Sequence, residues 1–136
     1  QEGSRPYQLD LESDKPLVLI IEDNTDIIDF IRTSLIYKYN FVVAENGEEG
    51  LVKANNFLPQ IVISDIMMPI MDGLTLCKRV KENPKTSHIS IILLTAKNLT
   101  SQKVEGIRIG AGAYITKPFE IDLLEAHIDH LIHRKK

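Results

Sequence analysis

Five short apolar runs, each followed by a stretch of helical periodicity, constrain the fold of this chain more than any other feature. The run Leu17–Ile21 is continuously apolar, which is typical of a strand buried on both faces. Further strands are predicted at 41–44, 61–65, 89–94 (ending at Thr95) and 113–116, and helices through 27–35 and over about 48–57, 74–82, 101–109 and 121–133. This alternation indicates an α/β fold, in which helices cover both faces of a parallel sheet and the crossovers are right-handed.

Length and composition narrow the class of protein. A chain of 136 residues has the size of one domain, and residues 1–15 lack apolar periodicity, so we expect a linker or tail there and a folded domain over 16–134. Acidic residues outnumber basic ones by 19 to 16, which is not the basic balance of a nucleic-acid-binding domain. The apolar runs are too short to span a bilayer, and a single cysteine, Cys77, excludes an internal disulfide.

Five polar residues follow the predicted strands at the point where each strand ends. Glu22 and Asp23 close the first strand, Asp65 the third, Thr95 the fourth and Lys117 the fifth. The carboxyl ends of parallel strands lie at one edge of a sheet, so we expect these side chains to gather there. Three carboxylates together repel one another, and Mg²⁺ relieves that repulsion because it prefers oxygen ligands. With a lysine ammonium and a hydroxyl donor nearby, the set predicts a pocket for a phosphoryl group on a carboxylate.

Each of these residues also has an ordinary structural explanation when it is taken alone. An acid such as Asp23 after a strand is often a helix N-cap, Thr95 could be a plain strand terminus, and Lys117 could be a solvated lysine. Chance explains the coincidence of five such residues at four strand ends less readily. The sequence therefore favours a site over a set of unrelated surface residues.

Four segments that carry these residues resemble the receiver domain of bacterial two-component response regulators. They are Ile20–Asn24, Asp65–Gly73, Leu94–Lys97 and Tyr114–Phe119, and the likeness extends over about residues 16–133. The most specific part is Asp-x-x-Met-Pro-x-Met-Asp-Gly with a downstream Lys-Pro-Phe. The resemblance implies a flavodoxin-like, doubly wound three-layer sandwich with five parallel strands in the order 2-1-3-4-5. The chain looks most like a receiver inside a hybrid sensor histidine kinase.

The resemblance implies roles for the residues that match the family pattern. Asp65 would be the phosphoacceptor, and Lys117 would pair with the phosphoryl oxygens. Mg²⁺ would be held by oxygens of Glu22, Asp23 and Asp65 and by the backbone carbonyl of Met67. Three further positions would serve the conformational switch and the backbone at the site: Thr95 would move toward the phosphoryl group, Tyr114 would swing inward, and a cis peptide bond would precede Pro118.

The implied function is phosphotransfer from a phosphohistidine of a histidine kinase or phosphotransfer domain to Asp65, which would control an output domain or partner. The domain would be cytoplasmic, including as the cytoplasmic part of a membrane-bound hybrid kinase, without direct contact to nucleic acid or membrane. It would not be an enzyme for outside substrates. A weak homodimer stays open, although Gly110–Ala113 lacks the acids through which one subfamily pairs.

Three alternatives stay open on the sequence. A phosphorylation-independent protein-binding module and a flavin-binding protein can share this sheet topology. An aspartyl-phosphate phosphatase is the third alternative, but the Asp-x-Asp pattern typical of one phosphatase family is missing after the strands that end at Ile21 and Asp65. The complete acidic set disfavours the first alternative, and the lack of a phosphate-cradling first loop disfavours the flavin protein.

Overall fold

The computed structural model describes residues 14–96 and 100–134, and its centre is a parallel sheet. The strand order is β2-β1-β3-β4-β5, so the predicted fold class and sheet order are confirmed. The strands are β1 (Leu17–Ile21), β2 (Asn40–Ala44), β3 (Ile61–Asp65), β4 (Ser90–Thr95) and β5 (Ala113–Thr116).

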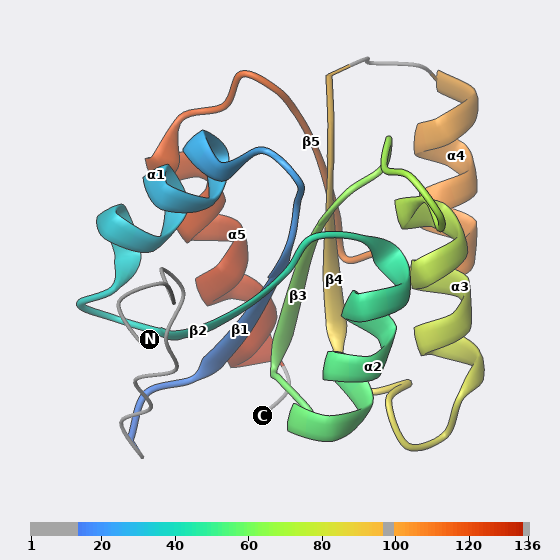
Figure 1. The fold of residues 1–136 in the computed structure, drawn as a ribbon, viewed down its shortest axis with the longest axis horizontal. Helices are drawn as coiled ribbons and strands as arrows, with labels where there is room; N and C mark the ends of the chain where they lie inside the picture. Colours follow the sequence, from blue (N-terminus) through green and yellow to red (C-terminus); the bar gives the residue numbers. More distant parts are fainter. Residues whose placement is uncertain (1–13, 97–99, 135–136) are drawn as a thin grey trace.

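Helices cover the sheet on both faces, as the alternating pattern predicted. Helices α1 and α5 lie on one face, and α2, α3 and α4 lie on the other (Figure 1). Their bounds are α1 (Thr25–Leu35), α2 (Gly47–Phe57), α3 (Gly73–Glu82), α4 (Thr100–Ile109) and α5 (Ile121–Arg134). Within the described ranges, no helix combines the length and the hydropathy that a membrane crossing requires.

The continuous apolar run of β1 is explained by two separate cores, one on each face of the sheet. Val18 and Ile20 belong to the core under α1 and α5, whereas Leu19 and Ile21 belong to the core under α2 and α3. All four side chains are at most 1% exposed. Successive residues of a strand point to opposite faces, so a strand between two helical layers needs apolar residues at every position.

Two strand boundaries differ by one residue from the prediction. Strand β2 begins at Asn40 rather than at residue 41, because the Asn40 N–H donates to the carbonyl of Pro16 at 2.9 Å. Strand β4 begins at Ser90, because the N–H of Ile89 bonds to the carbonyl of Thr86 at 2.9 Å and so belongs to the preceding turn.

Side-chain caps fix where three helices begin. The side chains of Asn24, Asn46 and Asp72 accept hydrogen bonds from backbone N–H groups in the first turns of α1, α2 and α3. As a result, α2 and α3 start at Gly47 and Gly73, one residue before the predicted positions. Because Asn24 caps α1, Asp23 is not needed as a cap.

A polar network joins α5 to the turn between α1 and β2. Lys38 Nζ lies 2.5 Å from Asp129 Oδ2 and 3.1 Å from Glu125 Oε2, and the Tyr39 hydroxyl donates to Asp129 Oδ1. Burial by itself raises the pKa of Asp129, but the hydrogen bonds from Lys38 and Tyr39 outweigh burial and lower it. The network therefore favours the charged form of this carboxyl.

The described chain starts and finishes at one edge of the sheet. Every strand runs away from that edge and every helix returns to it, so the start of β1 and the end of α5 both lie opposite the carboxyl ends of the strands (Figure 1). The predicted linker over 1–15 falls almost entirely outside the described residues, and Lys97 of the segment Leu94–Lys97 also lies outside them; the predicted domain boundaries stay a prediction.

Candidate functional site

Three carboxylates meet at the carboxyl edge of the sheet. Glu22 and Asp23 follow β1 and Asp65 ends β3, and one oxygen from each lies within 4.8 Å of the others. Glu22 is 1% exposed and Asp65 6% exposed, while Asp23 is open to solvent. The group is therefore a recessed pair of acids with a third acid at its mouth.

Backbone hydrogen bonds extend the sheet past the strands and fix the polar residues in place. Each bond joins the first residue after one strand to a carbonyl at the end of the neighbouring strand. The bonds are Glu22 N to Ala44 O at 3.0 Å, Ile66 N to Leu94 O at 2.9 Å and Lys117 N to Thr95 O at 2.6 Å. Because these backbones are held by the sheet, the side chains that they carry converge without depending on a mobile loop.

Lys117 bridges the two recessed acids. Its Nζ lies 3.2 Å from Glu22 Oε1 and 3.3 Å from Asp65 Oδ2, and its side chain is 15% exposed. Burial raises the pKa of the Glu22 carboxyl, the charge of Asp65 raises it further, and Lys117 opposes both effects. A hydrogen bond of 3.2 Å from the Asn24 N–H to Glu22 Oε2 also favours the carboxylate.

The donor set fits a hard divalent cation. Three carboxylates and one ammonium leave a formal excess of two negative charges in a mostly buried cluster. All the acidic groups offer oxygen atoms, which Mg²⁺ prefers, and the solvent-facing Asp23 leaves room for the waters that Mg²⁺ usually keeps. The charge and the chemistry of this cluster thus suit the ion that the sequence predicted.

The remaining predicted site residues lie around this acidic group. Thr95 ends β4 next to β3 and is fully buried, and Met67 in the β3–α3 loop is 57% exposed. Tyr114 of β5 packs against the core under α2 and α3, and its hydroxyl lies 3.5 Å from Gln102 Oε1 on α4. The Lys117–Pro118 peptide bond is cis, as the resemblance implied.

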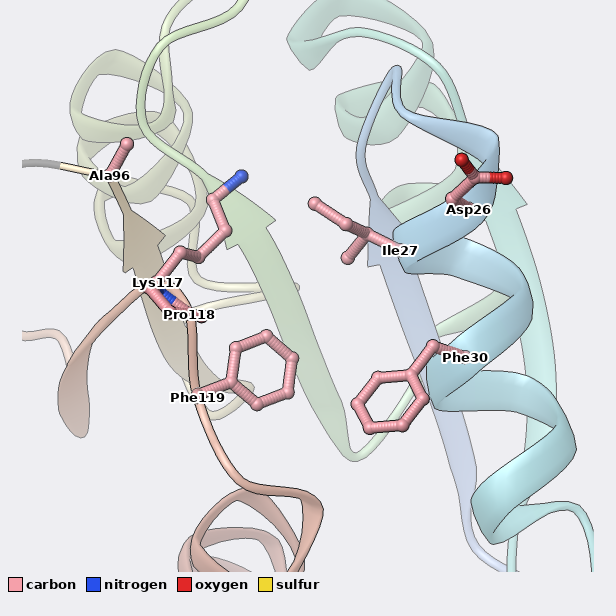
Figure 2. A pocket seen from close by; sticks show the side chains of 7 residues that line it. All are labelled: Asp26, Ile27, Phe30, Ala96, Lys117, Pro118 and Phe119. Carbon is pink, nitrogen blue, oxygen red and sulfur yellow. The ribbon is translucent and has the colours of Figure 1, made fainter.

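An apolar groove adjoins the acidic group on the side of α1. It has a volume of about 460 Å³, and in Figure 2 the side chains of Ile27 and Phe30 point from α1 toward Phe119 and Lys117 in the segment after β5. The rings of Phe30 and Phe119 are tilted against each other with centroids 6.1 Å apart. Its full lining is Asp26, Ile27, Phe30, Ala96, Lys117, Pro118 and Phe119.

Sequence reasoning missed this groove as part of the site. Ile27 fitted the helical period of α1, so it gave no sign of a role beyond packing. The available signal was Phe30, an aromatic residue that falls outside the apolar helical spacing; in the structure its side chain is 45% exposed. The pairing of Phe30 with Phe119 spans most of the chain and leaves no local pattern.

Comparisons with known proteins agree on one family. A family model described as the response regulator receiver domain matches residues 18–129. The chain is 40% identical over 124 residues to histidine kinase P4 of Formosa agariphila and 38% identical over 133 residues to sensor histidine kinase TmoS of Ectopseudomonas mendocina. These matches cover 91% and 98% of this chain but 9% and 14% of the relatives, so the chain spans a small part of their length.

A solved structure supports the same conclusion. The receiver domain of the Francisella response regulator 1452 superposes with a TM-score of 0.82 at 33% identity, covering 90% of this chain and all of the other. The likeness therefore extends over both the folded core and the edge that carries the acids.

Proposed function

The chain belongs to the response regulator receiver domain family, and on that premise we propose that Asp65 accepts a phosphoryl group from a phosphohistidine. One observation carries the proposal: Lys117 Nζ lies 3.3 Å from Asp65 Oδ2 and 3.2 Å from Glu22 Oε1, inside a cluster of three carboxylates. A lone strand-end acid needs no such arrangement, whereas a carboxylate that must hold a phosphoryl group needs cations around it.

The proposed step is one displacement at phosphorus. A carboxylate oxygen of Asp65 forms the new P–O bond while the P–N bond to the donor imidazole breaks and its electron pair returns to the ring nitrogen, which takes up a proton. Lys117 is already at hydrogen-bonding distance from Asp65, so it can pair with the phosphoryl oxygens without a large movement. Placement and charge neutralisation by groups already in position account for most of the rate in such transfers.

Mg²⁺ is part of the proposal. Glu22, Asp23, Asp65 and the backbone carbonyl of Met67 would hold it, and when bound it would neutralise charge on the transferring phosphoryl group. Glu22 and Asp65 are buried and so are largely shielded from bulk water, whereas Asp23 at the mouth faces solvent, from which the ligands approach.

The phosphodonor is a histidine kinase or a phosphotransfer domain, and the groove beside the acids is its proposed binding site. The groove is lined by Ile27, Phe30 and Phe119 (Figure 2). Lys117 also lines it and contacts Glu22 and Asp65 of the acidic group. A donor helix that places its histidine over Asp65 can lay apolar side chains into this groove. The two histidine kinase relatives support a place inside a hybrid kinase, and the domain is then cytoplasmic.

The output of the proposed reaction is a change in the population of two conformations. Thr95, which ends the strand beside Asp65, moves toward the bound phosphoryl group, and Tyr114 on the neighbouring strand moves inward. The phosphoryl group on Asp65 stabilises one conformation more than the other, and the surface changed in this way controls an output domain or a partner.

Intact-mass spectrometry after incubation with acetyl phosphate and Mg²⁺ tests the proposal. We expect one added phosphoryl group on the unaltered chain, loss of the adduct in mild base, and no adduct on Asp65→Asn. The control is Asp29→Asn, an exposed acid on α1 outside the cluster, which should be phosphorylated like the unaltered chain. An adduct of equal amount on Asp65→Asn would disprove the assignment.

A further inference from the structure

Gly47, the first residue of α2, lies against the loop that joins β3 to α3. A Cβ added to Gly47 would lie 2.4 Å from the carbonyl oxygen of Met71 and 2.9 Å from the Met71 Cβ. Non-bonded carbon atoms pack best at about 3.5–4.0 Å, so there is no room for a side chain here. Gly47 does not have a positive φ, so its own backbone does not require glycine. The requirement comes from the loop.

Helix α2 is held in place on two sides. The Asn46 side chain accepts a hydrogen bond from the Glu49 N–H at 2.8 Å, and the Glu49 side chain accepts one from the Glu45 N–H at 2.8 Å. This reciprocal pair is a capping box, which fixes where the helix begins. One turn further on, a Cβ on Gly50 would lie 2.3 Å from Cδ1 of Ile21 in β1, so the helix already touches the sheet. A side chain at position 47 would therefore displace the loop rather than the helix.

The loop is a small unit that closes on itself. The N–H of Gly73 donates to the carbonyl of Ile66 at 2.9 Å, and the N–H of Met71 donates to the carbonyl of Pro69 at 2.8 Å. The Met67 side chain is 57% exposed, so little packing resists movement at that end of the loop. Because these hydrogen bonds join both ends of the loop, a displacement at Met71 is passed on to Met67.

The backbone carbonyl of Met67 is the one proposed Mg²⁺ ligand that this loop supplies. Even a tight contact of 3.0 Å between a Cβ on Gly47 and the Met71 oxygen would require a movement of about 0.6 Å. Mg²⁺ demands nearly ideal octahedral geometry with oxygens at about 2.0–2.1 Å, so it tolerates such movements poorly. The carboxylates cannot follow the loop, because the sheet holds Glu22 through its N–H bond to the Ala44 carbonyl at 3.0 Å.

We infer that Gly47 is a positioning residue for the Mg²⁺ site. It has no side chain, so α2 can hold the loop where the Met67 carbonyl joins the carboxylates of the acidic group. The inference rests on the proposed function, because it concerns the ion that this function uses. Gly47 itself contributes no ligand and acts only through the backbone of the loop.

Gly50 offers a matched control on the same helix. Its added Cβ would lie 2.3 Å from a side-chain atom of Ile21, almost the same distance as at Gly47. Ile21 belongs to the core under α2 and α3, and the contact involves no atom of the loop. We therefore expect both Gly47→Ala and Gly50→Ala to lower the melting temperature, but only Gly47→Ala to weaken Mg²⁺ binding.

The experiment measures Mg²⁺ binding directly by isothermal titration calorimetry, and melting temperatures in EDTA report the stability of each variant. For Gly47→Ala we expect the Kd for Mg²⁺ to rise about ten-fold or more, the usual effect of losing a residue that orients a metal ligand. For Gly50→Ala the Kd should stay within about two-fold of the unaltered chain. The phosphorylation rate with phosphoramidate should fall for Gly47→Ala at low Mg²⁺ and recover at saturating Mg²⁺.

A second variant covers the case in which Gly47→Ala does not fold. Met71→Ala loosens the same contact from the side of the loop without a steric clash, and it should also weaken Mg²⁺ binding, by a smaller factor. An unchanged Kd for Gly47→Ala, or for Met71→Ala where the first variant is unfolded, would overturn the inference. Equal increases in Kd for Gly47→Ala and Gly50→Ala would overturn it too, because general loosening of the fold would then account for both. If the unaltered chain neither binds Mg²⁺ nor takes up a phosphoryl group, the proposed function itself fails.

Discussion

Replacement of Lys117 by methionine isolates the one cation that the described structure places among the buried acids. The ammonium lies 3.2 Å from Glu22 and 3.3 Å from Asp65, and each contact is worth roughly 5 kcal/mol of Coulomb energy at an effective dielectric of about 20. Desolvation of the ammonium offsets much of this, and removal of one partner of a buried pair costs about 3–5 kcal/mol. Because the Lys117 side chain is 15% exposed, we expect a loss near the lower end, about 3 kcal/mol.

The assay is urea unfolding followed by circular dichroism, first in EDTA and then with saturating Mg²⁺. The loss in EDTA should shrink to less than about half with Mg²⁺, because a bound cation takes over part of the charge neutralisation. Lys53→Met is the control: Lys53 pairs with the partly exposed Glu49 at 3.1 Å and donates to the carbonyl of Val43 at 2.5 Å, so its loss should be about 2 kcal/mol or less. Equal losses for the two variants, or no response of Lys117→Met to Mg²⁺, would refute the electrostatic account.

Two further predictions concern the free energy of unfolding. Tyr39→Phe removes a hydrogen bond to the Asp129 carboxylate and should cost about 1–2 kcal/mol. The pKa of Asp129 is lowered, so its contribution is present above the ordinary aspartate pKa and is lost as the pH falls through the folded-state value; Tyr39→Phe should flatten this acid-side loss in unfolding curves recorded at several pH values. Gly73→Ala should lower the free energy of unfolding by more than about 2 kcal/mol and slow phosphorylation, because its Cβ would lie 2.3 Å from the backbone oxygen of Asp65. Gly106→Ala should stay within about 1 kcal/mol, because the nearest neighbour of its Cβ is a side-chain carbon at 3.0 Å. Equal decreases in melting temperature for the two variants would contradict this explanation.

The sequence predicted the sheet well because its strands carry a strong and local signal. Strand β3 runs from Ile61 to Asp65 as predicted, since an apolar run between two helical layers must be continuous and ends where the first charged group appears. The same logic located the acids: once strand ends were known, parallel strands had to bring Glu22 and Asp65 to one edge. Helix starts were less well defined, because the caps at Asn46 and Asp72 set them.

Contacts between distant segments could not be predicted in the same way. The Phe30–Phe119 pair and the hydrogen bond from Tyr39 to Asp129 each join segments about 90 residues apart, and no local pattern encodes such a pairing. The positive φ of Ile70 runs against local preference, because a sequence rule would place Gly or Asn there. The hydrogen bond from the Met71 N–H to the carbonyl of Pro69, at 2.8 Å, closes a tight turn at this residue, and that turn requires the positive φ.

β1 begins and α5 ends at the edge of the sheet that faces away from the acids. A tether attached at Asp14 or at Arg134 therefore leaves the acidic group accessible. A flexible tether of n residues reaches about 5–6 Å times the square root of n, so even some twenty residues let the domain turn its acidic edge toward a donor roughly 25 Å away. The domain can thus approach a donor either untethered or on such a tether, and the length of the tether sets its effective concentration at the donor.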